Sequence, residues 1–155
     1  MPLTLVPLPA DHFDRWLQRS TREYIADLVA TGHSEHQAAT AAHQTMRQAF
    51  PEGKPTGSNS VFHVLDETLG VVGYLWIGRD TSEDPSSWWI WDVLIEEKFR
   101  GRGFGKATMP LAEEHARSQG ANTLGLNVFG FNKTARGLYE SIGYETTSLK
   151  MRKVL

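Results

Sequence analysis

The sequence predicts an α/β domain in which a mixed sheet is flanked by helices. Two observations indicate this class: apolar residues recur at helical spacing in the first third of the chain, and short β-rich runs alternate with helical segments in the last third. Strands separated by a helix tend to be parallel, whereas the hairpin expected in the middle of the chain is antiparallel. A length of 155 residues, with 40% hydrophobic residues and a net charge of −2, favours one domain with its own core.

The first third of the chain is predicted to form two helices. An apolar stripe over residues 13–29 has helical spacing, and Gly32 follows it as a typical helix stop. Ser34 and Gln37 have the spacing of a capping box, which predicts that a second, alanine-rich helix begins there. The prolines and glycines of residues 51–57 end this helix and begin a loop.

The middle of the chain is predicted to form strands. Two β-rich runs, Ser60–Asp66 and Val71–Ile77, flank a short turn that ends in Gly70, which is typical of a hairpin. A third strand is expected at Trp88–Ile95, where aromatic residues are dense.

The last third alternates between helix and strand. We expect a helix from about residue 104 to 119, a strand over 123–128, a helix over about 132–141, and strands from there to the C-terminus. The strand–helix–strand spacing makes the strands near residues 90 and 125 the expected parallel pair.

Composition excludes several classes of function. The absence of cysteine excludes a disulfide scaffold, a thiolate metal site and a cysteine nucleophile. The near-neutral charge gives no general field for nucleic acid, and no apolar run approaches the ~20 residues of a membrane helix. His33 and His36 lie three residues apart, but no matching third ligand set accompanies them. We therefore expect a cytoplasmic protein that binds no nucleic acid, membrane or metal.

A glycine-rich segment, Arg100-Gly-Arg-Gly-Phe-Gly-Lys106, follows a predicted strand and opens a predicted helix. Glycines at alternate positions let backbone N–H groups approach an anion, and the helix N-terminus and the basic side chains add positive charge. A tight turn with solvated basic residues is the alternative. The spacing Gly-x-Gly-x-Gly departs from a dinucleotide fingerprint, and a Walker A loop fails because Ala107 follows Lys106.

Two motifs together carry a family resemblance. The first is Arg-x-x-Gly-x-Gly at Arg100, Gly103 and Gly105. The second lies downstream and comprises Asn132, Ala135, Leu138, Tyr139, Gly143 and Tyr144. In this order they resemble the acetyl-CoA loop and the following Asn-x-x-Ala-x-x-Leu-Tyr segment of the GNAT superfamily of N-acetyltransferases, and the resemblance covers about residues 60–155.

The resemblance implies a fold and a division of labour. The fold would be a single GNAT-like α/β (α+β) domain over residues 1–155, with a mixed, mostly antiparallel sheet of about six to seven strands, a splayed parallel pair and about four flanking helices. Residues 1–58, an N-terminal strand and helical pair, would shape the acceptor site. Residues 59–155 would form the sheet and the acetyl-CoA-binding core. Dimers are common in the superfamily, so a homodimer stays open.

The resemblance also implies acetyl-CoA as co-substrate. Backbone groups of Val93, Leu94 and Ile95 would pair with pantetheine, and Asn132 would contact the pantetheine arm. The pyrophosphate would lie on the glycine-rich segment, whose expected binding residues are Arg100, Gly101, Arg102, Gly103, Phe104, Gly105 and Lys106.

Two residues are candidates for catalysis. Tyr139 matches the family's general acid; since a thiol has a pKa of about 8.5 and tyrosine about 10, stabilising the departing sulfur by a hydrogen bond is favoured over full protonation. Asp92 is the candidate base for an acceptor amine, directly or through a water, because a lysine-like amine costs about 4.6 kcal/mol to deprotonate at pH 7.

Structural roles remain as alternatives: Tyr139 could merely pack on the sheet, and Asp92 could be a hydrogen-bonded structural carboxylate. We expect direct acetyl transfer in a ternary complex to a small-molecule or peptide amine. The alternative function is a non-catalytic acyl-CoA binding or sensing module.

Overall fold

A five-stranded mixed sheet lies at the centre of the computed structural model, which describes residues 2–155. In spatial order the strands are β1 (Leu3–Pro7), β2 (Ser60–Asp66), β3 (Gly70–Arg79), β4 (Ser87–Ile95) and β5 (Thr123–Leu126). All neighbours are antiparallel except β4 and β5, which are parallel as expected.

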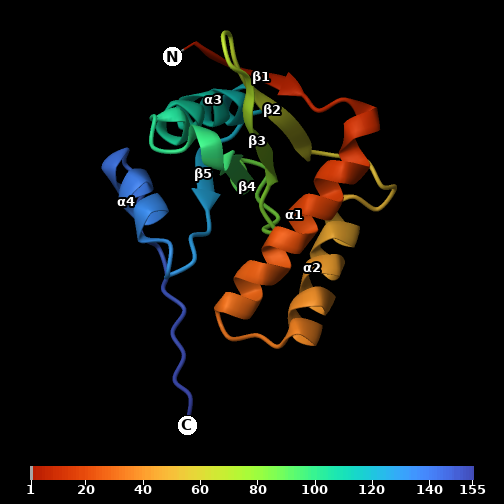
Figure 1. The fold of residues 1–155 in the computed structure, drawn as a ribbon, viewed down its shortest axis with the longest axis vertical. Coiled ribbons are helices and arrows are strands. Elements are labelled where there is room, and N and C mark those ends of the chain that lie inside the picture. The colour runs from red at the N-terminus through yellow and green to blue at the C-terminus, as the bar shows by residue number, and fades with distance from the viewer. Residues whose placement is uncertain (1) are drawn as a thin grey trace.

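Helices cover both faces of the sheet (Figure 1). The first two, α1 (Ala10–Ala30) and α2 (Glu35–Ala49), pack together on one face, and α3 (Phe104–Ser118) packs on the other. A short 3-10 turn (Glu97–Phe99) precedes α3, and α4 (Lys133–Ser141) follows β5.

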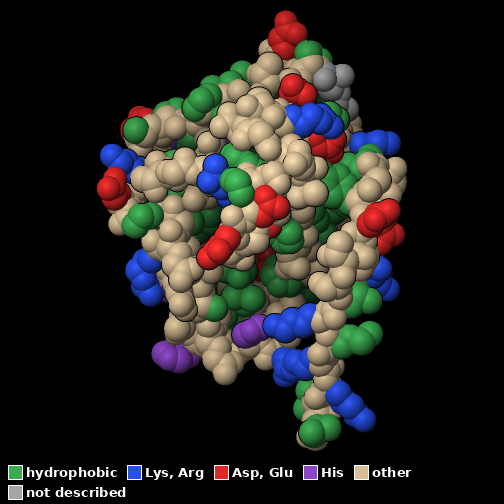
Figure 2. All heavy atoms as spheres, turned by 180° about the vertical axis from the view of Figure 1, so that it is seen from behind, with side chains coloured by type: hydrophobic (Ala, Val, Ile, Leu, Met, Phe, Trp, Pro, Cys, Tyr) green, Lys and Arg blue, Asp and Glu red, His purple; other side chains and the backbone are tan. Residues whose placement is uncertain are grey.

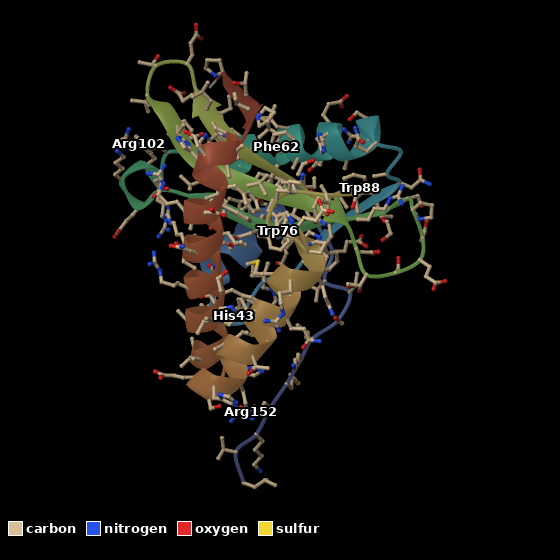
Figure 3. All side chains as sticks on the ribbon, turned by 90° about the vertical axis from the view of Figure 1, so that its right-hand side faces the viewer. His43, Phe62, Trp76, Trp88, Arg102 and Arg152 are labelled. Atoms are coloured by element: carbon tan, nitrogen blue, oxygen red, sulfur yellow. The ribbon has the colours of Figure 1, made fainter. Side chains whose placement is uncertain are left out.

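The alternation of side chains along β3 divides the interior into two cores. Leu75 and Ile77 pack with the side chains of α3, whereas Tyr74 and Trp76 pack with α1 and α2. Figure 3 shows Trp76 on the helical-pair side of the sheet and Trp88 on the opposite side. Each core is closed by an apolar helix face, which is why the helices form at these positions.

The predicted helix ends are confirmed for the helical pair. Ser34 Oγ accepts a hydrogen bond from the backbone N–H of Gln37 at 3.1 Å, and Gln37 Oε1 accepts one from the N–H of Ser34 at 3.1 Å. This is the predicted capping box at the start of α2. Gly32 has a φ of +105° just after α1, where a left-handed residue is needed to end the helix.

A β-bulge interrupts the pairing of β3 with β4. Trp76 pairs with Asp92, but the next residue of β3, Ile77, pairs with Ile90, so that Trp91 has no partner on β3. An extra residue shifts the alternation of side chains along the bulged strand. Asp92 therefore points toward α1, although Ile90, two residues earlier, belongs to the core on the α3 side.

The pairing of β4 with β5 also stops at this point. The last parallel pair joins Ile90 to Leu126, and residues 92–95 have a strand neighbour on the β3 side alone. This is the arrangement expected of a splayed parallel pair, and it leaves backbone groups of β4 available on the β5 side.

The expectation of six to seven strands is wrong, because within residues 2–155 the sheet has five. β5 ends at Leu126 rather than at residue 128, and residues 142–155 contain no strand. Leu149 and Met151 alternate with basic residues as in a strand, but they are exposed, and a strand needs a neighbour to satisfy its backbone groups. Figure 2 shows this C-terminal segment projecting from the body of the domain.

No helix among residues 2–155 has both the length and the apolar character needed to cross a membrane.

Candidate active site

A cavity of about 980 Å³ opens where β4 separates from β5. Its walls come from α1 and α2, β3 and β4, the glycine-rich turn, the end of β5 and α4. The space-filling view shows that the face behind β4 and β5 is hollowed near its centre, with hydrophobic and acidic side chains inside the hollow (Figure 2). A second groove, of about 540 Å³, lies between α1 and α2 and includes none of the predicted site residues.

Most of the predicted binding residues meet in the larger cavity. Those in its lining are Val93, Leu94, Ile95, Arg100, Gly101, Gly103, Phe104, Gly105, Lys106 and Asn132. Arg102 is the exception: its guanidinium lies 5.8 Å from the centre of the Phe99 ring, and it projects outward from the loop (Figure 3). A side chain in that position can contribute charge to the loop without lining the cavity.

The glycine-rich turn has a backbone that side chains would disfavour. Gly101 has a φ of +76° and Gly103 a φ of +84°, and Gly103 is the N-cap of α3. The Nε of Arg100 donates a hydrogen bond to the carbonyl of Ile95 at 2.9 Å, which ties the turn to the end of β4. A Cβ placed on Gly101 would meet nothing within 4 Å, so the surrounding residues leave open space at that position. With the first amides of α3 beside it, the turn fits an anionic group such as a pyrophosphate.

Asp92 lies on the wall of the cavity that faces α1. Its Oδ2 accepts hydrogen bonds from the Ser20 hydroxyl at 2.8 Å and from the Tyr74 hydroxyl at 2.9 Å. Burial raises the pKa of Asp92 to about 6; the two hydrogen bonds limit that increase, and the negative charges of Glu23 and Asp27 add to it. The carboxyl group is therefore a much stronger base than an ordinary aspartate, and it faces the cavity.

Tyr139 reaches the same cavity from α4. Burial, and after it the negative charge of Asp92, raises the pKa of Tyr139 above its usual value. The hydroxyl therefore stays protonated at neutral pH and can donate a hydrogen bond. The ring is oriented by an edge-on contact with Tyr144, whose hydroxyl donates to Glu113 Oε2 on α3 at 2.9 Å.

Asn132 also has a structural task. Its Oδ1 accepts a hydrogen bond from the backbone N–H of Ala135 at 3.2 Å and so caps α4. The side-chain NH₂ group of Asn132 remains available to donate hydrogen bonds into the cavity, which this residue lines.

Sequence reasoning missed the residues that hold Asp92. Ser20 is only 2% exposed and lies four residues after Trp16, on the buried side of α1. A serine within an apolar stripe was the available signal, because a buried hydroxyl needs a partner. Tyr74 gave the same signal, because it places a hydroxyl group within the apolar strand β3. Glu23, which contacts the Tyr74 hydroxyl, gave no such signal in the sequence.

Among residues 2–155, no cluster of three or more His, Cys, Asp or Glu side chains is placed to hold a metal ion.

Comparison with known proteins identifies the family. The model of the acetyltransferase (GNAT) family matches residues 13–144. The chain belongs to the GNAT family. Bacillus subtilis YycN, named as an uncharacterized N-acetyltransferase, is 30% identical over the whole of both chains. A second N-acetyltransferase of the same organism with the same description, YdgE, is 27% identical over 100% of this chain and 99% of its own.

Solved structures of this family share the fold. The crystal structure of YycN superimposes with a TM-score of 0.90 over 99% of each chain. The aminoglycoside N-acetyltransferase AAC(6')-Iy, solved in complex with CoA, gives a TM-score of 0.60 over 99% of this chain and 95% of its own. At 12% identity this second likeness concerns the fold alone. This GNAT member is thus an acyltransferase, and residues 2–155 form one mixed sheet of five strands with four α-helices.

Proposed function

We propose that this GNAT protein transfers acetyl from acetyl-CoA to a primary amine, which attacks the thioester carbonyl directly in a ternary complex. One observation supports this above the others: the free edge of β4 and the glycine-rich turn open into the same cavity as Asp92 and Tyr139. Residues suited to hold a donor and residues suited to move protons therefore surround one space.

The donor side of the cavity is built mainly from backbone. Residues 93–95 lie beyond the last β4–β5 pair and can pair with the amides of the pantetheine arm as an added strand would. The turn at residues 101–106 can hold the pyrophosphate with backbone N–H groups, while Lys106 adds positive charge. Acetyl-CoA supplies the acetyl group as a thioester.

The acceptor side is built from α1, within the segment 1–58 that we assign to acceptor binding. Asp92 accepts the proton of the incoming ammonium group. Its pKa of about 6, compared with 3.8 for an ordinary aspartate, lowers the free-energy cost of that transfer by about 3 kcal/mol. The acidic groups on this wall, Asp92, Glu23 and Asp27, together carry negative charge, which favours a cationic acceptor before it is deprotonated.

Tyr139 serves the leaving group. The raised pKa of its hydroxyl makes full proton transfer to the sulfur unfavourable, so the residue donates a hydrogen bond to the developing charge. Tyr139 and Asp92 therefore line one cavity from two different elements, α4 and β4.

Ligand binding is tested by thermal unfolding with acetyl-CoA, CoA and NADH in parallel. A ligand present at 100 times its dissociation constant adds about 2.7 kcal/mol, which raises the melting temperature by roughly 5–10 °C for a domain of this size. We expect both CoA species to raise it and NADH to have no effect. The absence of an effect with either CoA species would refute the assigned donor site.

Transfer itself is tested by the release of CoA thiol with a panel of amines. The chain has no cysteine, so every thiol that appears comes from the donor. Acetyl-CoA binding without thiol release from any amine would favour a binding module instead of transfer to an amine.

A further inference from the structure

The hydroxyl of Tyr74 lies between two carboxylates. Its oxygen is 2.9 Å from Asp92 Oδ2 and 2.9 Å from Glu23 Oε2. A tyrosine hydroxyl carries one hydrogen and donates one full hydrogen bond, so it satisfies one of the two carboxylates. The other contact is favourable only if that carboxyl group carries a proton of its own and donates it to the tyrosine oxygen.

The arrangement at Asp92 strengthens this requirement. Asp92 Oδ2 already accepts the hydroxyl hydrogen of Ser20 at 2.8 Å. With both carboxylates ionised, Asp92 Oδ2 and Glu23 Oε2 would both face the partly negative oxygen of Tyr74 in a largely buried place. Only the single hydrogen of the tyrosine hydroxyl would lie between these three oxygen atoms. One additional proton removes the repulsion and completes a continuous chain of hydrogen bonds.

We propose that Asp92 and Glu23 share one proton through Tyr74, and that Glu23 is the positioning residue through which a proton taken up by Asp92 leaves the site. This inference rests on the proposed acetyl transfer to an amine. The chain runs from the cavity wall at Asp92 to Glu23, whose side chain is 38% exposed and therefore in contact with water.

The proton transfer balances without any ion on the tyrosine. With the shared proton on Glu23 at rest, the N–H bond of the ammonium group breaks and its proton binds Asp92, while Glu23 releases its own proton to water. The Asp92 proton then moves to the oxygen of Tyr74 as the tyrosine's own hydrogen moves to Glu23 Oε2, so that Asp92 is again a base and Glu23 again holds the shared proton. Burial and the two carboxylates raise the pKa of Tyr74, so the two movements at its oxygen must occur together.

Other charged and titratable groups face this chain. On α1, Arg19 Nε lies 3.0 Å from Glu23 Oε1, and its guanidinium lies 5.8 Å from the centre of the Tyr74 ring. Nη2 of the same guanidinium group donates a hydrogen bond to Glu96 Oε2 at 3.0 Å. The negative charge of Asp27, on α1, raises the pKa of Asp92. The negative charge of Asp92 in turn raises the pKa of Tyr139, on α4.

The first test uses the free protein and needs no catalysis. Carboxyl carbons of labelled Asp and Glu are followed by ¹³C NMR from pH 4 to 9 in the wild type and in Glu23→Gln. We expect the Asp92 midpoint to move toward lower pH in Glu23→Gln, because the second carboxylate of the pair is gone. Two controls should leave the midpoint near its wild-type value: Glu114→Gln, on the exposed side of α3, and Glu96→Gln, which weakens the Arg19 pair without touching Tyr74.

The second test is kinetic and uses a double-mutant cycle. Glu23→Gln and Tyr74→Phe should each lower kcat by about tenfold for an amine of high pKa and leave KM for acetyl-CoA unchanged, and the acidic limb of the pH–rate profile should move. The double variant should lose no more than the worse single variant, since both substitutions break the same chain. Losses that multiply, or an Asp92 midpoint unchanged by Glu23→Gln, would overturn the proposal.

The two tests separate this inference from the proposed function. If the wild type acetylates no amine, the function fails while the NMR titration still decides whether the proton is shared. Glu23 lies at a partly exposed position, so Glu23→Gln remains informative if Tyr74→Phe fails to fold.

Discussion

Asp92→Asn should make the protein more stable at pH 8 while it removes the proposed base. In the folded protein the pKa of Asp92 is about 6, whereas in the unfolded chain it is about 3.8. Between these values the folded state holds more protons, so the stability falls as the pH rises. The cost of keeping this carboxylate ionised in the folded protein is fully present above about pH 6 and absent below about pH 4.

The size of the effect follows from the same pair of values. An increase from 3.8 to about 6 corresponds to about 3 kcal/mol, which is an upper limit for the gain from removing the charge. An asparagine can accept the hydrogen bonds of Ser20 and Tyr74 through its carbonyl oxygen and never ionises. For a domain of this size, 1–3 kcal/mol raises the melting temperature by roughly 2–12 °C.

Thermal unfolding of wild type and Asp92→Asn at several values between pH 4.5 and 8.5 measures this directly. The gain should be largest at pH 8 and should shrink as the pH falls through 6 toward 4. Asp14→Asn, on the exposed side of α1, should change the melting temperature little at any pH. A variant that is less stable than wild type at pH 8, or a gain that does not depend on pH, would refute the reasoning.

Three further predictions test other parts of the structure. Gly101→Ala and Gly53→Ala introduce the same backbone strain, since both glycines have positive φ and open space around the added Cβ, so each should cost about 1–2 kcal/mol of stability. Only Gly101→Ala should also weaken acetyl-CoA binding, as measured by calorimetry. If both variants bind acetyl-CoA equally well, the turn is excluded from the donor site. Tyr139→Phe should lower turnover at least about tenfold with little change in acetyl-CoA affinity. Tyr144→Phe, which loses the hydrogen bond to Glu113, should lower the melting temperature by about 2–4 °C and largely keep turnover. A larger loss of turnover in Tyr144→Phe than in Tyr139→Phe would remove Tyr139 from the chemistry. Ser34→Ala should lower the free energy of unfolding by about 1 kcal/mol, because the capping box is lost, and should leave turnover unchanged. An unchanged melting temperature would show that α2 does not depend on its cap.

Features fixed by neighbouring residues could be predicted from the sequence. The capping box at Ser34 depends on residues three apart, and the β2–β3 turn depends on the left-handed glycine at Gly70. The turn before α3 and the motif on α4 likewise carry their information within a few residues. These local signals carried the family resemblance that predicted one site for the glycine-rich turn, Tyr139 and Asn132, and in the structure all three line one cavity.

Features that depend on distant partners could not be predicted. The bulge at Trp91 is a property of the register between two strands, and nothing in the sequence of β4 states that register. The bonds of Ser20 and Tyr74 to Asp92 join α1, β3 and β4, so they follow from packing. The expected C-terminal strand failed for the same reason, because alternating side chains favour a strand but cannot supply the neighbour that it needs.

The bulge in β4 links the two halves of the site through the length of one strand. The free edge of β4 that is proposed to bind the donor begins at the bulge, on the side that faces β5. At the same point Asp92 turns toward α1, where the acceptor is proposed to bind. Adding or removing one residue in this part of β4 would therefore disturb donor and acceptor together. Changes on the cavity-facing side of α1 alter the acceptor wall and leave the donor edge in place. Under the proposed function, the choice of acceptor can therefore diverge by substitution in one helix, while the length of β4 stays under constraint from both substrates.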